Sequence, residues 1–461
     1  MCRDARGATA KRNAWRTLLA CTALALIAPA AASAYPASHG LRKTVLSHRA
    51  APQTATCEQG GSRCFLPAQV QHAYDTTPLY REGYEGQGET IVIVDSFGSP
   101  TIQHDLSVFD SAYSLPEPPS LEVIQPAGQV ARYRQKNVEM VGWAAETTID
   151  VECAHLIAPA ARILLVETPV AETQGVQGFP QIVAAENYVI EHHLGQVISQ
   201  SFGSGEDDFP DQNAIRALRS ANVNAAAAGV TMLAAAGDNG VDEEDLEGGY
   251  FSHREQSWPS SDPLVTSVGG TQMHLDAAGE RVRPDTVWKE VEPTGVSYGG
   301  GGGPSHVFGR PAYQQLLETG SGAYRATPDI SMNAGEKAGL VVFSSFRSKV
   351  EGEPDGPTFW DAAGTSVATP LFAGVVALLD QVAGHPLGEI NPALYQLAAS
   401  AGWGASGLVD VTEGNNTFLI RGEEGETLLR VAGFRAKPGY DMASGLGTVD
   451  AYRLAHSLAG H

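Results

Sequence analysis

Short, continuous apolar segments recur along the chain, and longer periodic segments lie between them. The apolar segments are TIVIVDSF (90–97), ARILLVET (161–168), QVISQSFG (196–203), VTMLAAAG (230–237), LVTSVGGT (264–271) and LVVFSS (340–345). The segments 179–194 and 211–228 have helical periodicity. Apolar strands separated by helices are typical of a parallel sheet that is covered on both faces. We therefore expect an α/β fold with a mainly parallel central sheet, and functional residues at the carboxyl ends of its strands.

The first 34 residues have the layout of a secretory signal peptide. A basic stretch (1–16) precedes an apolar stretch (17–31), and Ala-Ser-Ala at 32–34 is a small-residue cleavage site. A faint lipoprotein-type box at 18–21 fits less well, because the apolar stretch continues past it. We expect a secreted, extracellular protein in which 35–64 form a short polar leader and 65–461 form one domain.

The chain is strongly acidic, with a formal net charge of −22. The signal-like segment is itself basic, so the remaining chain is more acidic still. Such a surface repels nucleic acid and anionic membranes, and it keeps the protein soluble down to mildly acidic pH. We expect no nucleic-acid partner and no membrane partner.

Three cysteines lie outside the signal-like segment. Cys57 and Cys64 flank a short polar loop, which in a secreted protein predicts a disulfide. A metal site at this pair lacks a second pair of ligands at suitable spacing. Cys153 is left over, and we expect it to be a small buried residue rather than a reactive thiol.

The stretch DAAGTSVATPLFAGVVALL (361–379) reads as a glycine turn that presents a serine at the start of a helix. Gly364 allows the turn, and Ser366 suits the first helical residues. Pro370 falls near the first turn, where a missing N–H costs little. The pattern fits a nucleophile, although a plain serine cap has the same appearance. A serine nucleophile needs a base to take its proton.

No histidine stands out as that base. Asp95 ends a buried strand, as the aspartate of a subtilisin-type triad does, but the His-Gly-Thr-His stretch that such a triad needs is missing. His104 has no glycine beside it, and His192 and His193 fit a solvated helix face. His155 lies in an apolar context that is typical of a core histidine.

Carboxylates are the remaining candidates for the base. Glu146 and Asp150 lie four residues apart on one face of an expected helix. Such a pair commonly marks a wet surface, but apolar and small residues surround this one. Two like charges in such surroundings resist joint ionisation, so one of them keeps its proton at a raised pKa. A carboxylate is a usable base near its own pKa, in acid.

Asp238 follows an apolar strand within AAAGDNG. An Asp-Asn-Gly sequence is also an ordinary turn former. If the Asp238 carboxyl is protonated, it can donate a hydrogen bond to an oxyanion.

In this order, the motifs resemble the sedolisin family of serine-carboxyl peptidases, which share the subtilisin fold. The resemblance runs from about residue 66 to 454, and the motifs that carry it are ETTID, AAAGDNG, WPSSDPLVTSVGGT, GGGGPS, TPDIS and GTSVATP. It implies that Ser366 is the nucleophile, Glu146 the general base, Asp150 the residue that orients Glu146, and Asp238 the oxyanion acid. By the same analogy, the glycine-rich segment 297–305 lines the substrate cleft.

The resemblance also implies one structural Ca²⁺ ion near the C-terminus. Its ligands would be the side chains of Asp410 and Asp441 and the carbonyls of Val411, Lys437 and Gly439. Oxygen ligands of this kind suit calcium. The alternative is that these residues form two acidic turns without an ion. Lys437 stands where the family usually has glycine, and its ammonium group would weaken calcium binding.

Two further features depart from the family pattern. Sedolisins typically carry a long prosegment, whereas only residues 35–64 separate the expected cleavage site from the matching region. Phe202 stands where relatives often have tryptophan, near the glutamate, so the acidity of Glu146 can differ.

The sequence therefore predicts a secreted, monomeric serine-carboxyl endopeptidase that cleaves protein or peptide substrates through an acyl-enzyme and is most active in acid. Two alternatives stay open. One is a catalytically silent secreted binding protein on the same fold. The other is a subtilisin-type Asp-His-Ser peptidase that uses Asp95 and an unidentified histidine.

Overall fold

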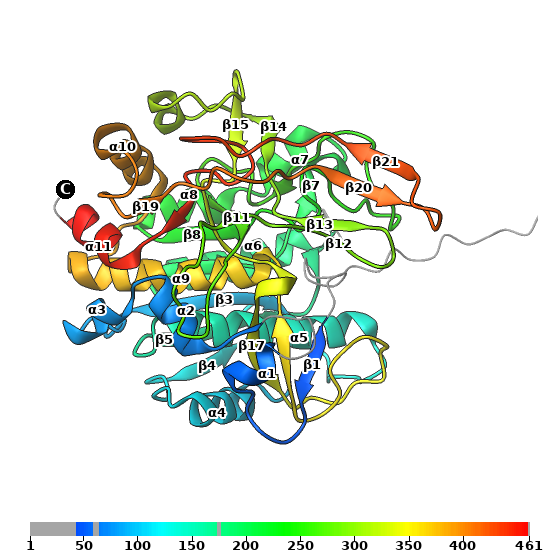
Figure 1. The fold of residues 1–461 in the computed structure, drawn as a ribbon, viewed down its shortest axis with the longest axis vertical. Coiled ribbons are helices and arrows are strands. Elements are labelled where there is room, and N and C mark those ends of the chain that lie inside the picture. The colour runs from blue at the N-terminus through cyan, green and yellow to red at the C-terminus, as the bar shows by residue number, and fades with distance from the viewer. Residues whose placement is uncertain (1–42, 59–63, 173–176, 460–461) are drawn as a thin grey trace, which may run out of the picture. The chain divides into compact units, whose positions relative to one another are not determined.

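The central sheet is the largest element of the structure, a computed structural model that describes residues 43–58, 64–172 and 177–459 (Figure 1). The strand order is β11-β10-β8-β6-β3-β5-β4, and β16 also pairs with β10. In that order the strands span Thr286–Val287, Thr266–Gln272, Thr231–Ala235, Val197–Gln200, Thr90–Ser96, Arg162–Thr168, Leu121–Ile124 and, for β16, Ile330–Asn333. Only β11 is antiparallel to its neighbour among these described strands. The predicted mainly parallel sheet is confirmed.

Both faces of this sheet are buried, which explains the continuous apolar strands. In β3, Ile91 and Ile93 belong to one hydrophobic cluster, and Val92 and Val94 belong to another. Successive side chains of a strand point to opposite faces, so a strand between two covered faces needs apolar residues at every position.

Helices cover both faces. Helices α5 (Val138–Ile157) and α9 (Thr365–Ala383) contribute to the first cluster, and α6 (Phe179–Glu191) and α8 (Ser220–Ala228) contribute to the second. The other described α-helices are α1 (Thr54–Glu58), α2 (Pro67–Ala73), α3 (Thr77–Arg81), α4 (Ile102–Tyr113), α7 (Gln212–Ala217), α10 (Asn391–Ala401) and α11 (Ala451–Ala459). The described 3₁₀ helices are η2 (Glu206–Asp208), η3 (Ala312–Leu316) and η4 (Glu336–Ala338).

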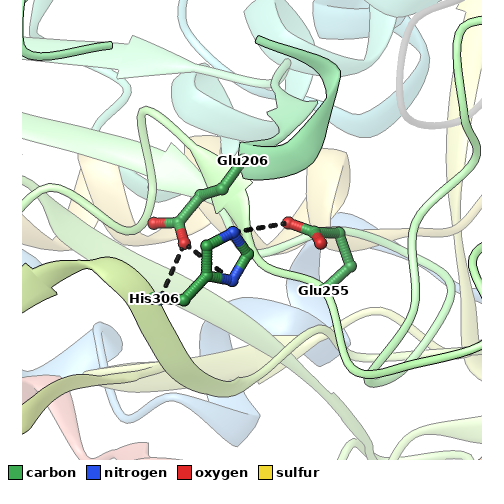
Figure 2. A group of neighbouring side chains, drawn as sticks. All are labelled: Glu206, Glu255 and His306. Carbon is green, nitrogen blue, oxygen red and sulfur yellow. Dashed lines mark hydrogen bonds and ion pairs between the residues drawn. The ribbon is translucent and has the colours of Figure 1, made fainter. Parts of the chain in front are cut away.

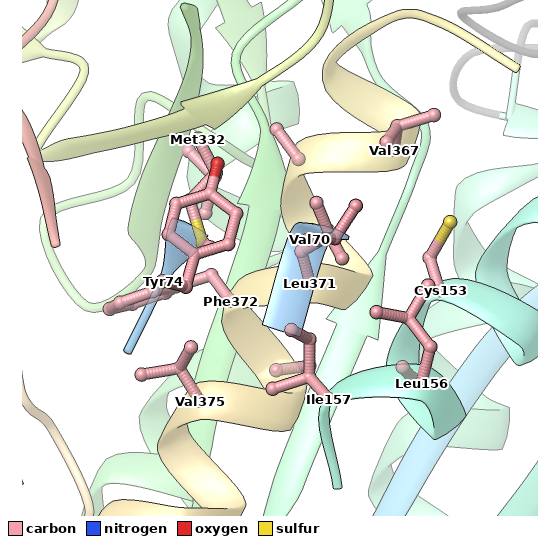
Figure 3. Close-up of a cluster of buried hydrophobic side chains, with 14 of the residues drawn as sticks. Val70, Tyr74, Cys153, Leu156, Ile157, Met332, Val367, Leu371, Phe372 and Val375 are labelled. Carbon is pink, nitrogen blue, oxygen red and sulfur yellow. The ribbon is translucent and has the colours of Figure 1, made fainter. Parts of the chain in front are cut away.

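The pair α5 and α9 packs tightly side by side (Figure 3). Ile157 at the end of α5 lies among Leu371, Phe372 and Val375 of α9 in the labelled cluster. A Cβ added to Gly374 of α9 would lie 2.6 Å from Ile157 Cβ, which is closer than side-chain carbons approach. Glycine at this position therefore allows the two helices to come together.

A second sheet has the order β1-β18-β17-β2. These strands span Thr44–Ser47, Thr358–Ala362, Gly339–Ser344 and Cys64–Phe65. The apolar run at 340–345 is indeed a strand, β17, but our expectation that it joins the parallel sheet is wrong, because it pairs antiparallel with β18. The helical segment expected at 211–228 is also divided, into α7 and α8.

The segment before residue 65 contributes directly to the fold. β1 pairs antiparallel with β18, and Cys57 and Cys64 form the predicted disulfide with their Cα atoms 4.8 Å apart. The predicted signal peptide, 1–34, lies outside the described residues, as do 35–42 and 59–63 of the predicted leader.

Five pairs of short strands complete the described part of the chain. They are β12 (Lys289–Val291) with β13 (Ser297–Gly299), β14 (Gly303–Gly309) with β15 (Tyr324–Thr327), β19 (Leu408–Val409) with β22 (Thr448–Val449), β20 (Phe418–Arg421) with β21 (Thr427–Val431), and β7 (Ser204–Gly205) with β9 (Ser257–Trp258). Among the described helices, α9 alone is long and apolar enough to cross a membrane, and 83% of its apolar window is buried in the protein.

Candidate active site

Ser366 lies in the first turn of α9, just after the end of β18. Gly364, between the strand and the helix, has a φ of 103°, a left-handed conformation that favours glycine. The Ser366 side chain is buried, and its Oγ has no hydrogen-bond partner in the described part of the chain. The predicted turn that presents a serine at a helix start is confirmed, and the helix dipole there favours negative charge.

Ser201, just after β6, connects this turn to α5. Pro370 has no N–H to donate, so the Ser366 carbonyl lacks the usual helical donor four residues further on. Ser201 Oγ lies 3.5 Å from that carbonyl oxygen and donates to Asp150 Oδ1 at 2.7 Å. The structure thus brings Asp150 next to the turn that carries Ser366.

Glu146 and Asp150 are both fully buried on α5, one helical turn apart. Asn137 starts this helix, because its side-chain oxygen accepts the N–H of Met140 at 2.8 Å. Burial raises the pKa of Asp150 well above its usual range, and the charges of Asp95 and Glu146 raise it further. The expectation of a buried acidic pair in which one member keeps its proton agrees with this arrangement.

Asp95 is a third buried carboxyl in the same group. It lies at the carboxyl end of β3, is only 1% exposed, and is close enough to Asp150 for its charge to raise the pKa of that carboxyl. Burial raises the pKa of Asp95 to about 7, and the charge of Glu167 adds to the rise. From the sequence, Asp95 is expected only in a histidine-based triad, although its place at the end of a buried strand is a signal for this acidic group as well.

Asp238 lies directly beside the serine turn. Its Oδ1 accepts hydrogen bonds from the backbone N–H and the Oγ1 of Thr365, both at 2.7 Å. Its Oδ2 is buried and has no hydrogen-bond partner among the described residues. Burial raises the pKa of Asp238 to about 7, against the opposing effect of the two Thr365 bonds. This carboxyl is therefore protonated in acid and has one oxygen available for a ligand.

The glycine-rich segment 297–305 packs against the loop that carries Asp238. The Gly299 N–H donates to the Asp238 carbonyl at 2.7 Å, and the Gly301 N–H donates to the Gly237 carbonyl at 2.9 Å. A Cβ on Gly301 would overlap the backbone of Ala236. We expected these glycines to admit a substrate backbone, whereas at Gly301 it is the protein's own backbone that requires glycine.

The other residues considered in the sequence lie in ordinary structural environments. His155 is a core residue whose Nε2 lies 2.9 Å from the Pro116 carbonyl, and His192 and His193 are exposed at the end of α6, as expected. Cys153 is a free, fully buried cysteine, as expected, and burial raises the pKa of its thiol.

Phe202 is buried after β6. It packs against Trp143, with ring centroids 6.3 Å apart. Because Trp143 lies three residues before Glu146 on α5, Phe202 belongs to the apolar surroundings of that helix face.

The residues of the predicted calcium site lie in two neighbouring loops. The Gly439 N–H donates to Asp410 Oδ2 at 2.9 Å, and the Lys437 N–H donates to Asp441 Oδ2 at 2.9 Å. Val411 also donates a backbone hydrogen bond to Asp410. Burial raises the pKa of both carboxyls, so each lies in a partly desolvated position where a bound cation would offset the cost of its charge.

Comparison with known proteins identifies relatives over most of the chain. Residues 137–394, more than half of the chain, match the subtilase family. The chain is 30% identical over 410 residues to kumamolisin from Bacillus sp. (strain MN-32), an alignment that covers 88% of this chain and 65% of kumamolisin. It is 27% identical over 369 residues to sedolisin from Pseudomonas sp. (strain 101), covering 79% of this chain and 57% of sedolisin. It is 32% identical over 275 residues to human tripeptidyl-peptidase 1, covering 58% and 44%.

A solved structure confirms the fold. The complex of Pseudomonas sedolisin, a serine-carboxyl proteinase, with two molecules of pseudo-iodotyrostatin superimposes with a TM-score of 0.72 at 25% identity and covers 87% of this chain and 100% of that chain. The chain spans less than two thirds of the length of the curated relatives that it matches. It belongs to the subtilase family, and within that family it is a sedolisin-type member with a subtilisin-like fold.

Proposed function

We propose that the protein is a serine-carboxyl peptidase that hydrolyses peptide bonds through an acyl-enzyme and is most active at acid pH. The observation that carries this proposal is that two buried oxygens at one turn, Ser366 Oγ and Asp238 Oδ2, have no hydrogen-bond partner among the described residues. The other oxygen of Asp238 accepts from Thr365, which holds the carboxyl beside Ser366. An attacking hydroxyl and an acid for the resulting oxyanion are the two groups that acyl transfer needs there. The relatives support the same reaction class.

In the first step, Ser366 Oγ attacks the carbonyl carbon of the peptide bond, and Glu146 takes the hydroxyl proton as general base. Asp150 holds Glu146 in place and takes part of the charge of that proton. The hydrogen bond from Ser201 fixes Asp150, and Asp95 belongs to the same buried acidic group. Glu146 then gives its proton to the leaving amine, and water releases the acyl group by the reverse sequence.

Asp238 would stabilise the oxyanion of the tetrahedral intermediate. Its Oδ1 is occupied by Thr365, so Oδ2 carries the proton that it donates. Because its pKa is about 7, this donor is present below that pH and is lost above it. Activity is therefore expected in acid and is expected to fall as the pH rises through neutrality.

The experiment that tests this function is a pH–rate profile on a denatured protein substrate, for the wild type and Glu146→Gln. We expect a maximum below pH 7 and a loss of more than about tenfold in the variant, as for removal of a general base. Glu139→Gln, in the first turn of the same helix, is the matched control and should keep wild-type activity.

Labelling of Ser366 by a peptide aldehyde at pH 4 separates the alternatives. Absence of both labelling and hydrolysis would favour a silent binding protein. A rate that rises between pH 6 and 8 would instead indicate a histidine base.

We also propose that the enzyme is a secreted, monomeric endopeptidase that acts on proteins or peptides. The signal-like residues 1–34 and the acidic composition support secretion and solubility. Mass spectrometry of the products tests the mode of cleavage, because internal fragments indicate an endopeptidase and short N-terminal products indicate an exopeptidase.

We further propose that Asp410, Asp441 and the carbonyls of Val411, Lys437 and Gly439 hold one structural Ca²⁺ ion. Two partly desolvated carboxylates in adjoining loops fit a hard cation. A calcium chelator should lower the melting temperature of the wild type, and added Ca²⁺ should restore it. The melting temperature of Asp441→Asn should be the same with and without the chelator. If the chelator left the melting temperature of the wild type unchanged, the calcium site would be contradicted.

A further inference from the structure

A second group of acidic and histidine side chains lies outside the acids described above. It consists of Glu206 and Asp207 in η2, His253 and Glu255 before β9, and His306 in β14, and we call it the histidine–carboxylate cluster. Figure 2 shows His306 between Glu206 and Glu255, so that the two nitrogens of its ring face different carboxylates. Three separate segments of the chain therefore bring together five side chains that can bind a metal ion.

Two carboxylates each face two imidazoles. His253 Nε2 lies 3.0 Å from Asp207 Oδ2 and 3.4 Å from Glu255 Oε2. His306 Nε2 lies 3.0 Å from Asp207 Oδ1 and 3.9 Å from Glu255 Oε1. Ligands of a tetrahedral zinc ion, with bonds of about 2.1 Å, lie about 3.4 Å from one another. The four N···O distances lie on either side of that value, although the two imidazoles face different oxygens of each carboxylate. The ligand atoms form two groups of three, Asp207–His253–Glu255 and Glu206–Glu255–His306, which share Glu255.

Glu255 is the buried member of this arrangement. It is 1% exposed, and its Oε2 has no hydrogen-bond donor in the described part of the chain, although His253 Nε2 lies near it. His253 Nε2 is hydrogen-bonded to Asp207 Oδ2 and faces Glu255 Oε2 without hydrogen-bond geometry, so a shared ion would lie between this nitrogen and the two carboxylates. The side chains of His253 and Asp207 are about half exposed, so an ion can enter from solvent.

Glu206 has a different place in the cluster. Its Oε1 accepts a hydrogen bond from Ser305 Oγ at 2.5 Å. Its Oε2 accepts one from the backbone N–H of His306 at 2.9 Å and lies 3.4 Å from the ring nitrogen Nδ1 of the same residue. A histidine that binds a metal through one ring nitrogen usually gives the other to a carboxylate, which fixes the orientation of the ring. Glu206 is placed to do this for His306, and it leaves His306 Nε2 facing Asp207 and Glu255.

We propose that His253, His306, Asp207 and Glu255 bind one zinc ion, with Glu206 as the residue that positions His306. Imidazole nitrogens favour zinc over calcium, which takes oxygen ligands. The ion would join η2, the segment before β9 and β14.

The test is zinc binding to the full chain carrying Ser366→Ala, which prevents self-digestion, at pH 7 with millimolar Ca²⁺ to fill the C-terminal site. Competition with a fluorescent zinc chelator should give one zinc per chain with a dissociation constant of micromolar or below. Co²⁺ should give the visible absorption of a tetrahedral ion with nitrogen and oxygen ligands.

Variants then assign the ligands. His253→Ala and His306→Ala should each weaken zinc binding by more than about tenfold, and Glu206→Gln should weaken it about tenfold. The matched control is His72→Ala, which removes an exposed histidine that lies 2.9 Å from Glu280. Circular dichroism confirms that the variants are folded. Equal affinity of the His253 and His306 variants with the control, or no zinc bound by the parent chain, would overturn the proposal.

Discussion

Two oxygen atoms define the candidate active site at the scale of single residues. Ser366 Oγ and Asp238 Oδ2 are both buried, and neither has a hydrogen-bond partner among the described residues. Leaving a buried polar atom without a partner costs about 1–3 kcal/mol, so such atoms are rare and call for a reason. In the proposed function, a bound substrate supplies the missing partners of these two atoms.

Replacement of Asp238 tests its role as an acid. Asp238→Ala removes the donor and should lower kcat about 10²- to 10³-fold, as for loss of one oxyanion donor. Asp238→Asn keeps an oxygen for Thr365 and a donor that does not titrate, so it should lose less. Its pH–rate profile should also lack the decline near pH 7 that the titration of Asp238 produces.

Asp242→Asn is the matched control for this experiment. Burial likewise raises the pKa of Asp242 to about 7, but its Oδ1 accepts the backbone N–H of Glu243 and makes no bond to Thr365 in the described part of the chain. This variant should keep both the rate and the shape of the profile. An Asp238→Asn profile that still declines near pH 7 would show that another group sets the alkaline limb.

At the scale of elements, the packing of α5 against α9 fixes the distance between the acids and the serine. Glu146 and Asp150 come from one helix and Ser366 from the other. The helices are in close contact at Gly374, eight residues after Ser366 on α9. A residue that separates the two helices there would also move Glu146 away from Ser366.

Gly374→Ala should therefore impair both stability and catalysis. The added methyl group would overlap Ile157 and the Ala154 carbonyl, and overpacking of this kind costs about 1–3 kcal/mol. We expect a lower urea midpoint and a reduced kcat with little change in KM, because a shift of the helices misplaces the base.

Ala377→Gly, one turn further along the same helix, separates the two effects. It lowers helix propensity by about 1 kcal/mol but adds no atoms between the helices. Its stability should fall while kcat stays at the wild-type value. If Gly374→Ala also left kcat unchanged, the spacing of the helices would not control catalysis.

Much of this arrangement could be predicted from the sequence, and the misses have physical causes. Local signals located Ser366, Glu146 and Asp238, because a glycine turn, a helical spacing and the end of a strand are all encoded within a few residues. The assignment of β17 to the wrong sheet reflects a short apolar run, which does not specify its partner strand. The link between Asp95 and Asp150 depends on how β3 and α5 pack, and no local pattern encodes it.

At the scale of the whole molecule, buried carboxyls dominate the electrostatics. Burial raises the pKa of Asp95 and Asp238 to about 7, and that of Glu186 and Asp380 to about 8. A carboxyl with a raised pKa in the folded state stabilises the fold fully below its unfolded pKa, near 4, and this contribution is lost as the pH rises through the folded value. The free energy of unfolding should therefore be greatest in mild acid and decline between about pH 5 and 8.

Glu186 offers a clean test, because burial alone raises its pKa. Each unit of pKa difference is worth about 1.4 kcal/mol, so Glu186→Gln should reduce the loss of stability between pH 5 and 8 by at least about that amount. Urea unfolding of the Ser366→Ala chain at several pH values measures it. Glu191→Gln, at the exposed end of the same helix, should leave the pH dependence unchanged. If both variants changed the pH dependence of the free energy of unfolding equally, that dependence would arise from net charge instead.

The pairing of β1 with β18 has a consequence for proteolysis. β18 is an interior strand of its sheet only because β1 covers one side of it, and two residues after β18 ends comes Gly364, where the serine turn begins. The exposed stretch 48–50 connects β1 to the rest of the chain. A cut there would allow β1 to dissociate, and β18 would then be an exposed edge strand whose backbone can pair with another chain. Trimming of the chain at this point would therefore expose an aggregation-prone strand close to Ser366.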